Sequence, residues 1–250
     1  MNPIDVEFRM YRVVEIESGT VLASAGDLRG FFINPGDLEF GNITLVNPAP
    51  ISPNKMRSQS AELQIINLRH DKVGAYYLGQ VRLGRSGLAS GNQDLGPVEY
   101  SFAGYRWDYP WAGRIWQRWA TGGPIVCGEW AGYPSEHHRD WLHVVQTSWF
   151  ETRSGPALGA QAKNISIDGS FMPTRSSFYC ALGESMNGPG GYFGSNLDAL
   201  IDCLRGVRGG KFAINVTWEN FSAAIDSLGE GFVKEVISIF GGEGVHVRRK

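Results

Sequence analysis

The sequence predicts an α+β protein with a mainly β N-terminal domain over residues 1–157 and an α/β domain over residues 158–250. Segments rich in β-branched and aromatic residues dominate the first part, which is typical of a sandwich or a barrel-like sheet. At 152–160, small residues, Gly and Pro then interrupt both the helical and the strand periodicity of apolar residues, as is typical of a linker. Beyond them, strand-like runs alternate with apolar residues at helical spacing, which favours a small parallel sheet with crossover helices.

In the first part, strands are expected at 10–16, 62–68, 76–83, 98–105 and 143–150. Between the last two lies a tryptophan-rich patch consisting of Trp107, Trp111, Trp116, Trp119, Trp130 and Trp141. Trp111, Ile115 and Trp119 recur at the spacing of an amphipathic helix. Three interpretations of the patch stay open: an aromatic core cluster, a protein-binding surface, or a platform that stacks on nucleic-acid bases.

In the second part, helices are expected after Thr174 as a cap, over 221–228 and over 233–240. Another helix follows a glycine-rich aromatic turn, where Ser195 or Asn196 can cap its start and Gly206 can end it. Its apolar residues, at i, i+3, i+4 and i+7, form one face, and Asp198 and Asp202 lie one turn apart on another. By themselves, two such carboxylates indicate only a solvated helix face.

Composition excludes several classes of protein. At 250 residues and 42% apolar content the chain can build real cores, and its net charge of −2 gives no basic surface for direct nucleic-acid binding. No apolar run approaches the ~20 residues of a membrane span, and the first residues lack a secretory signal. Three cysteines without C-x-x-C spacing favour a reduced, cytoplasmic protein.

No pattern of catalytic, metal-ligating or cofactor-binding residues stands out, so we expect neither an enzyme nor a cofactor or metal site. The histidines at 137, 138 and 143 lack the H-E-x-x-H spacing of a zinc protease and indicate a hydrated turn beside a strand. Cys127 has strand-like neighbours and is expected to be a buried small residue rather than a nucleophile. The glycines at 188–191 are not followed by the G-K-[ST] of a phosphate loop.

Residues 192–206 read Y-F-G-x-N-L-D-A-L-x-D-C-L-x-G, a segment that resembles the central part of the barstar family of ribonuclease inhibitors. The likeness extends to the family's first strand and turn at 165–169, its second strand at 212–218 and its last helix at 236–240. It covers roughly the last third of the chain. The resemblance implies a three-stranded parallel sheet packed by helices, in agreement with the periodicity.

The resemblance also implies an immunity-type inhibitor that occludes the active site of a ribonuclease or nuclease toxin by acidic charge mimicry. Over residues 168–243 the chain has nine acidic and five basic side chains, which suits a cationic cleft. Asp198 and Asp202 are expected to meet that cleft, with an aromatic rim at its mouth. The expected partner-binding residues are Tyr192, Phe193, Gly194, Asn196, Asp198, Ile201, Asp202 and Glu243.

Departures from the family pattern concern the aromatic positions. Ile201 and Val207 stand where tryptophans are expected, Phe193 replaces a tyrosine, and the end after the last helix is short. These differences favour a cognate nuclease other than barnase, and they make Glu243 the one candidate for a further carboxylate contact. In such an inhibitor, the N-terminal region would add contacts to a larger toxin or mediate self-association. An alternative function stays open, in which the N-terminal region is an enzyme or ligand-binding domain and the C-terminal domain is a docking module.

Overall fold

The computed structural model describes residues 8–50, 56–86, 99–152, 163–208 and 214–250. Contacts divide the chain into two compact units, Met1–Gly123 and Pro124–Lys250. The predicted boundary between residues 157 and 158 lies outside the described residues. Residues 124–152, which the sequence analysis assigned to the N-terminal domain, group by their contacts with the C-terminal unit.

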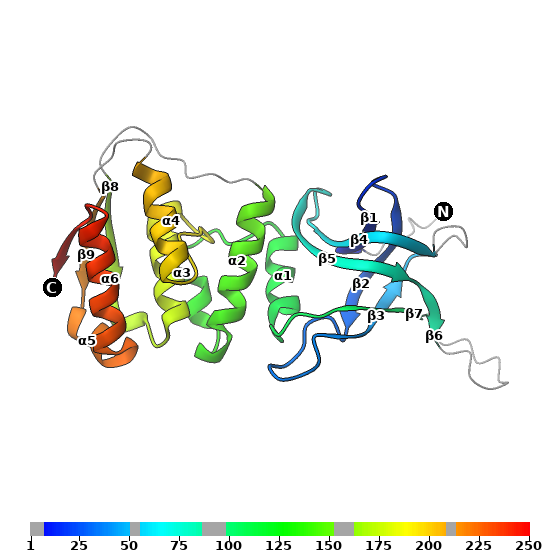
Figure 1. The fold of residues 1–250 in the computed structure, drawn as a ribbon, viewed down its shortest axis with the longest axis horizontal. Helices are drawn as coiled ribbons and strands as arrows, with labels where there is room; N and C mark the ends of the chain where they lie inside the picture. Colours follow the sequence, from blue (N-terminus) through cyan, green and yellow to red (C-terminus); the bar gives the residue numbers. More distant parts are fainter. Residues whose placement is uncertain (1–7, 51–55, 87–98, 153–162, 209–213) are drawn as a thin grey trace, which may run out of the picture. The chain divides into compact units, whose positions relative to one another are not determined.

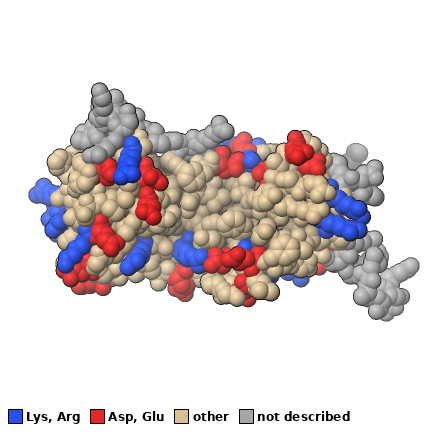
Figure 2. Space-filling view, in the orientation of Figure 1, with Lys and Arg blue, Asp and Glu red and all other residues tan. Residues whose placement is uncertain are grey.

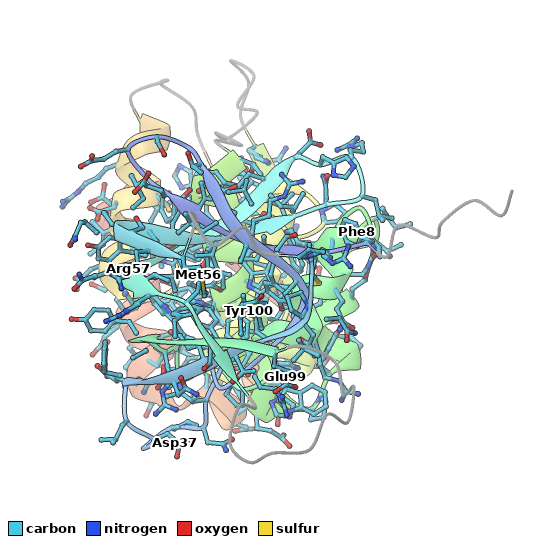
Figure 3. All side chains as sticks on the ribbon, turned by 90° about the vertical axis from the view of Figure 1, so that its right-hand side faces the viewer. Phe8, Asp37, Met56, Arg57, Glu99 and Tyr100 are labelled. Atoms are coloured by element: carbon cyan, nitrogen blue, oxygen red, sulfur yellow. The ribbon has the colours of Figure 1, made fainter. Side chains whose placement is uncertain are left out.

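The N-terminal unit is a curled antiparallel sheet of seven strands in the order β5-β4-β1-β2-β3-β7-β6 (Figure 1). Although β5 and β7 are not hydrogen-bonded neighbours, they lie in contact, so the sheet bends into a barrel-like shape as predicted. The elements are β1 Tyr11–Glu15, β2 Val21–Arg29, β3 Phe40–Pro48, β4 Arg57–Ile66, β5 Lys72–Arg82, β6 Gly84–Ser86, β7 Glu99–Tyr105 and α1 Ala112–Ala120. In Figure 3, Arg57 marks the start of β4 and Glu99 that of β7, where Glu99 is ion-paired with Arg29 of β2.

The core of this unit is aromatic where α1 packs onto the sheet. Trp116 of α1 is fully buried, and its indole Nε1 donates a hydrogen bond of 2.8 Å to the hydroxyl of Tyr76 on β5. Gly74 makes room for this ring, since a Cβ there would lie 2.3 Å from its Cη2 atom. Trp119 is buried as well, and Trp111 is half-buried beneath the guanidinium of Arg114. The described structure therefore assigns Trp116 and Trp119 to the core, and it places the predicted patch in two separate units.

The C-terminal unit has a three-stranded parallel sheet in the order β10-β9-β8, packed by helices (Figure 1). Its elements are η2 Glu129–Gly132, η3 Ser135–His137, α2 His138–Thr152, β8 Lys163–Asp168, η4 Gly169–Phe171, α3 Arg175–Asn187, α4 Leu197–Arg208, β9 Ile214–Glu219, α5 Phe221–Leu228, α6 Glu230–Gly242 and β10 His246–Arg249. Trp218 of β9 is fully buried and stacks on Phe178 of α3, with ring centroids 5.5 Å apart. Phe232 of α6 meets the edge of Phe178, so helix and sheet share one aromatic core.

One predicted element is wrong: the strand at 143–150 is part of helix α2. Val144 and Val145 favour a strand by propensity, and burial of most of the residues from 138 to 145 removes the polar face that would reveal a helical period. The burial pattern in the structure is helical, since Trp141, Val144 and Ser148 are buried at i, i+3 and i+7.

Candidate functional site

Helix α4 begins at an asparagine cap and presents its charged face outward. The Oδ1 atom of Asn196 accepts a hydrogen bond of 2.8 Å from the backbone N–H of Ala199, which satisfies one of the free donors of the first turn. Leu200 and Leu204 are buried against the unit, and Ile201 is half-buried. The helix runs on to Arg208, so the prediction that Gly206 ends it in a left-handed conformation is wrong.

Asp198 and Asp202 are both exposed on this helix. Within the described part of the chain, no cationic side chain forms an ion pair with either carboxylate. Two like charges one turn apart destabilise a helix by a few tenths of a kcal/mol. The charge of Asp202 also acts on its neighbours, because burial and then this charge raise the pKa of the Cys203 thiol to about 11. Among the described residues the two carboxylates thus form an acidic surface without an ion-pair partner, which we call the acidic pair.

The turn before α4 is packed backbone to backbone on α3. A Cβ at Gly183 of α3 would lie 2.3 Å from the carbonyl oxygen of Gly191, so only glycine fits there. Gly194 has φ +95°, and a Cβ there would lie 2.9 Å from the backbone nitrogen of Leu200. The side-chain amide of Asn187 donates a 2.7 Å hydrogen bond to the carbonyl of Tyr192. These contacts fix the position from which α4 starts.

Tyr192 and Phe193 lie beneath the surface rather than around the acidic pair as an exposed rim. They are only 4% and 3% exposed. The Tyr192 hydroxyl is 3.4 Å from the Oγ atom of Ser195. Burial is the main cause that raises the pKa of Tyr192, and the negative charge of Asp202 adds to it. The two rings support the acidic pair from inside the unit.

Glu243, the further carboxylate candidate, follows α6 and lies beside α4. Its Oε1 atom is 3.2 Å from the Nε atom of Arg205 on α4, an ion pair between the two helices. The structure thus brings Glu243 to the same helix as the acidic pair. Its charge is compensated by Arg205, in contrast to that of Asp198 and Asp202.

A buried carboxylate that sequence reasoning missed holds two loops together. The Oε2 atom of Glu184 accepts hydrogen bonds from the backbone N–H of Gly128 at 2.6 Å and from the indole of Trp130 at 3.0 Å. Its Oε1 atom accepts one at 3.1 Å from the backbone N–H of Gly190, in the turn that leads to α4. A single glutamate within a helix carries no recognisable motif, so the sequence gives no signal for this role.

This carboxylate makes stability pH-dependent. Burial raises the pKa of Glu184 above its ordinary value of 4.5, although hydrogen bonds from Gly128, Gly190 and Trp130 act in the opposite direction. A raised folded-state pKa gives stability that is fully present below the unfolded-state pKa and is lost as pH rises through the folded-state pKa. The Glu184→Gln variant stays neutral throughout. We therefore expect the free energy of unfolding of the wild type, relative to this variant, to decrease as pH rises from the ordinary carboxyl pKa through the raised one.

Urea unfolding of both proteins over a pH series measures this difference. A difference that is constant or that increases with pH would contradict the assignment of Glu184 as a buried, destabilised anion.

Two predictions, those for the histidines and for Cys127, need correction. His138 and His143 lie on helix α2 rather than on a turn beside a strand. His138 is buried rather than on a hydrated turn; its ring nitrogens lie 2.7 Å from the Ser177 hydroxyl and 3.0 Å from the Tyr133 carbonyl oxygen, and burial lowers its pKa. Cys127 is exposed rather than buried, because residues 124–128 belong to no helix or strand that would cover it. Partial desolvation and then the charge of Glu184 raise the pKa of this exposed thiol, which is the opposite of the shift that activates a cysteine nucleophile.

The N-terminal unit has a cavity of about 360 Å³ of its own. Its walls are mainly aromatic, with two acidic residues and one arginine: Glu39, Tyr77, Tyr105, Arg106, Trp107, Asp108 and Tyr109. The guanidinium of Arg106 is held by the carbonyl of Leu38, to which Nε donates at 2.9 Å. Among the described residues, no group of three His, Cys, Asp or Glu side chains is placed to hold a metal ion. In the same ranges, no helix combines the length and apolar character needed to cross a membrane.

Comparison with known proteins bears on the C-terminal unit alone. Residues 162–246 match the family described as Barstar (barnase inhibitor). The match runs from just before β8 to the start of β10 and contains every predicted partner-binding residue, whereas α2 and the N-terminal unit lie outside it. No curated protein matches the chain. Residues 162–246 are a Barstar family domain in the C-terminal part of this chain.

Proposed function

We propose that the chain is an inhibitor, not an enzyme, and that it occludes the active site of a ribonuclease or nuclease toxin. The acidic pair carries this proposal: two exposed carboxylates, uncompensated by any described cation, stand on a capped helix inside a Barstar family domain. A nuclease cleft must bind the phosphates of its substrate with cationic side chains. Asp198 and Asp202 offer that cleft two negative charges at fixed positions.

The other predicted residues support this display in different ways. Asn196 caps α4, and Gly194 allows the close approach of the turn to Leu200. Half-buried Ile201 is the residue before Asp202 and supplies apolar surface beside it. On the C-terminal unit, at the left of Figure 2, acidic and basic side chains are interspersed on the visible face without an extended basic field. This distribution suits a protein partner better than nucleic acid. An immunity role of this kind places the protein in the cytoplasm of the cell that it protects.

The salt dependence of association tests charge mimicry. If the acidic pair meets a cationic cleft, the association rate constant should decrease by about tenfold or more between low and high salt, because the Debye length falls from ~10 Å at 0.1 M to ~3 Å at 1 M. Dissociation should change much less, since short-range packing governs it. Stopped-flow measurements with a panel of small basic secreted ribonucleases, barnase among them, give both constants for the member that is bound most tightly.

Binding to no member of the panel, a salt-independent association rate, or turnover of RNA by this chain alone would each count against the inhibitor. The aromatic cavity of the N-terminal unit favours the alternative in that case, a ligand-binding or enzymatic N-terminal domain with the Barstar family domain as a docking module.

A further inference from the structure

Helix α2 lies outside the Barstar family match but belongs to the same compact unit. It packs against α3, and most of its first eight residues are buried. Figure 1 shows α2 beside α3 in this unit. Near its C-terminal end the pattern reverses, because Phe150 is 65% exposed. The unit therefore carries a large apolar side chain on its surface from a segment that the family domain does not contain.

Phe150 is joined to the candidate site by a ring contact. Its ring centroid is 5.5 Å from that of Tyr192, with the planes tilted by 59°. Tyr192 itself is buried, and its hydroxyl lies 3.4 Å from the Oγ atom of Ser195, two residues before α4 begins. Phe150 thus lies against the turn that leads into α4 and its acidic pair. The exposed aromatic residue next to Tyr192 is therefore Phe150, which the sequence did not single out, whereas Tyr192 and Phe193 are buried.

An exposed aromatic ring beside uncompensated charges has the composition of an interaction surface. Aromatic side chains are enriched among the residues that dominate binding energy, and they act best where surrounding contacts exclude water. The neighbouring charges decide between two occupants. A second copy of this chain, related by a two-fold axis, would bring its own acidic pair close to Asp198 and Asp202, and like charges in contact oppose association. A cationic partner meets no such repulsion.

We propose that Phe150 extends the acidic pair into one continuous binding surface, and that its occupant is the same basic nuclease, with an apolar lip beside its cationic cleft. This inference rests on the proposed function and adds a contact from α2, outside the family domain. In the complex, Asp198 and Asp202 meet the cleft and Phe150 packs on its lip. The segment that precedes the Barstar family domain thereby contributes to the choice of nuclease.

The Phe150→Ala variant tests the surface, with Phe171→Ala as the matched control. Phe171 lies on η4 in the same unit and is 63% exposed, so the two substitutions remove equal side chains of nearly equal exposure. With the panel nuclease that the wild type binds most tightly, Phe150→Ala should increase the dissociation rate constant about 10- to 100-fold. The association rate constant and its salt dependence should stay near the wild-type values, since no charge changes. Phe171→Ala should change both constants less than about twofold.

A second variant separates binding from a merely structural cover over Tyr192. In the Phe150→Lys variant, the aliphatic part of the lysine side chain can still cover the Tyr192 ring, while its ammonium group faces the cationic partner. At low salt the variant should associate more slowly than the wild type, and this difference should shrink as salt is raised. Both variants should unfold near the wild-type temperature.

The outcomes distinguish this inference from the function on which it rests. If Phe150→Ala dissociates like the wild type while Asp202→Ala loses binding, the role of Phe150 is overturned and the inhibitor stands. If the wild type binds no nuclease of the panel, the proposed function fails and the inference fails with it. A wild-type dimer that Phe150→Ala converts to a monomer, with unchanged nuclease binding, would assign the surface to a second copy of this chain and overturn the proposal.

Discussion

Replacing Asp202 by alanine is expected to lower the affinity for the nuclease by at least ~100-fold, about 3 kcal/mol, with almost no change in stability. Asp202 is exposed on α4, and no described cation is paired with it. Truncating one member of a desolvated charge pair leaves the partner's charge buried and uncompensated, which accounts for the large loss. In the free protein the same change removes only a surface group, worth within ~0.5 kcal/mol.

Asp198→Ala should act in the same direction with a smaller effect. Asp202→Asn keeps the shape of the side chain and removes its charge, so a similar loss with this variant would assign the effect to electrostatics. The matched control is Asp226→Ala, since Asp226 is an exposed aspartate on α5 of the same unit. Equilibrium binding by calorimetry and thermal unfolding together measure affinity and stability. If Asp202→Ala bound with wild-type affinity, the acidic pair would not be part of the interface.

Periodicity predicted the elements that are amphipathic in the structure. Helix α4 follows the spacing of Leu200 and Leu204, and α1 follows that of Ile115 and Trp119, because each helix has one buried and one solvated face. Helix α2 escaped this rule because its first eight residues are buried on most sides. The third strand, β10, was not located, since two of its four residues are arginines and the strand lies at the edge of the sheet.

The acidic pair could be predicted from a four-residue spacing, but the surroundings of the pair could not. The position of Phe150 against Tyr192, and of Glu184 against Gly128, depends on how α2 and the segment before it pack on α3. Such contacts join residues about 40 to 56 positions apart and leave no local pattern. The turn at Tyr192 and Phe193 was interpreted as an exposed rim because two adjacent aromatic residues in a glycine-rich turn show no burial period. The close approach of the turn to α3, and for Tyr192 also the ring of Phe150, buries them.

This close approach leads to the second large expected effect: Gly183→Ala should destabilise the C-terminal unit by about 3 kcal/mol. The new Cβ would lie 2.3 Å from the carbonyl oxygen of Gly191 and 3.2 Å from the backbone nitrogen of Phe193. Both neighbours are backbone atoms, so relief requires the whole turn to move away from α3. The gain in helix propensity, at most ~1 kcal/mol, offsets only part of this cost.

The control is Gly231→Ala on α6, where a Cβ would meet no atom within 4 Å. That variant should be neutral or more stable by about 0.5 kcal/mol, since alanine favours the helix. Thermal unfolding measures both changes in stability, since 1 kcal/mol shifts the unfolding temperature of a chain of this size by roughly 2–4 °C. Because the turn fixes the start of α4, Gly183→Ala should also weaken nuclease binding, in contrast to Gly231→Ala. A Gly183→Ala protein that unfolds at the wild-type temperature and binds at full affinity would show that the turn can shift freely, and that the position of the acidic pair does not depend on it.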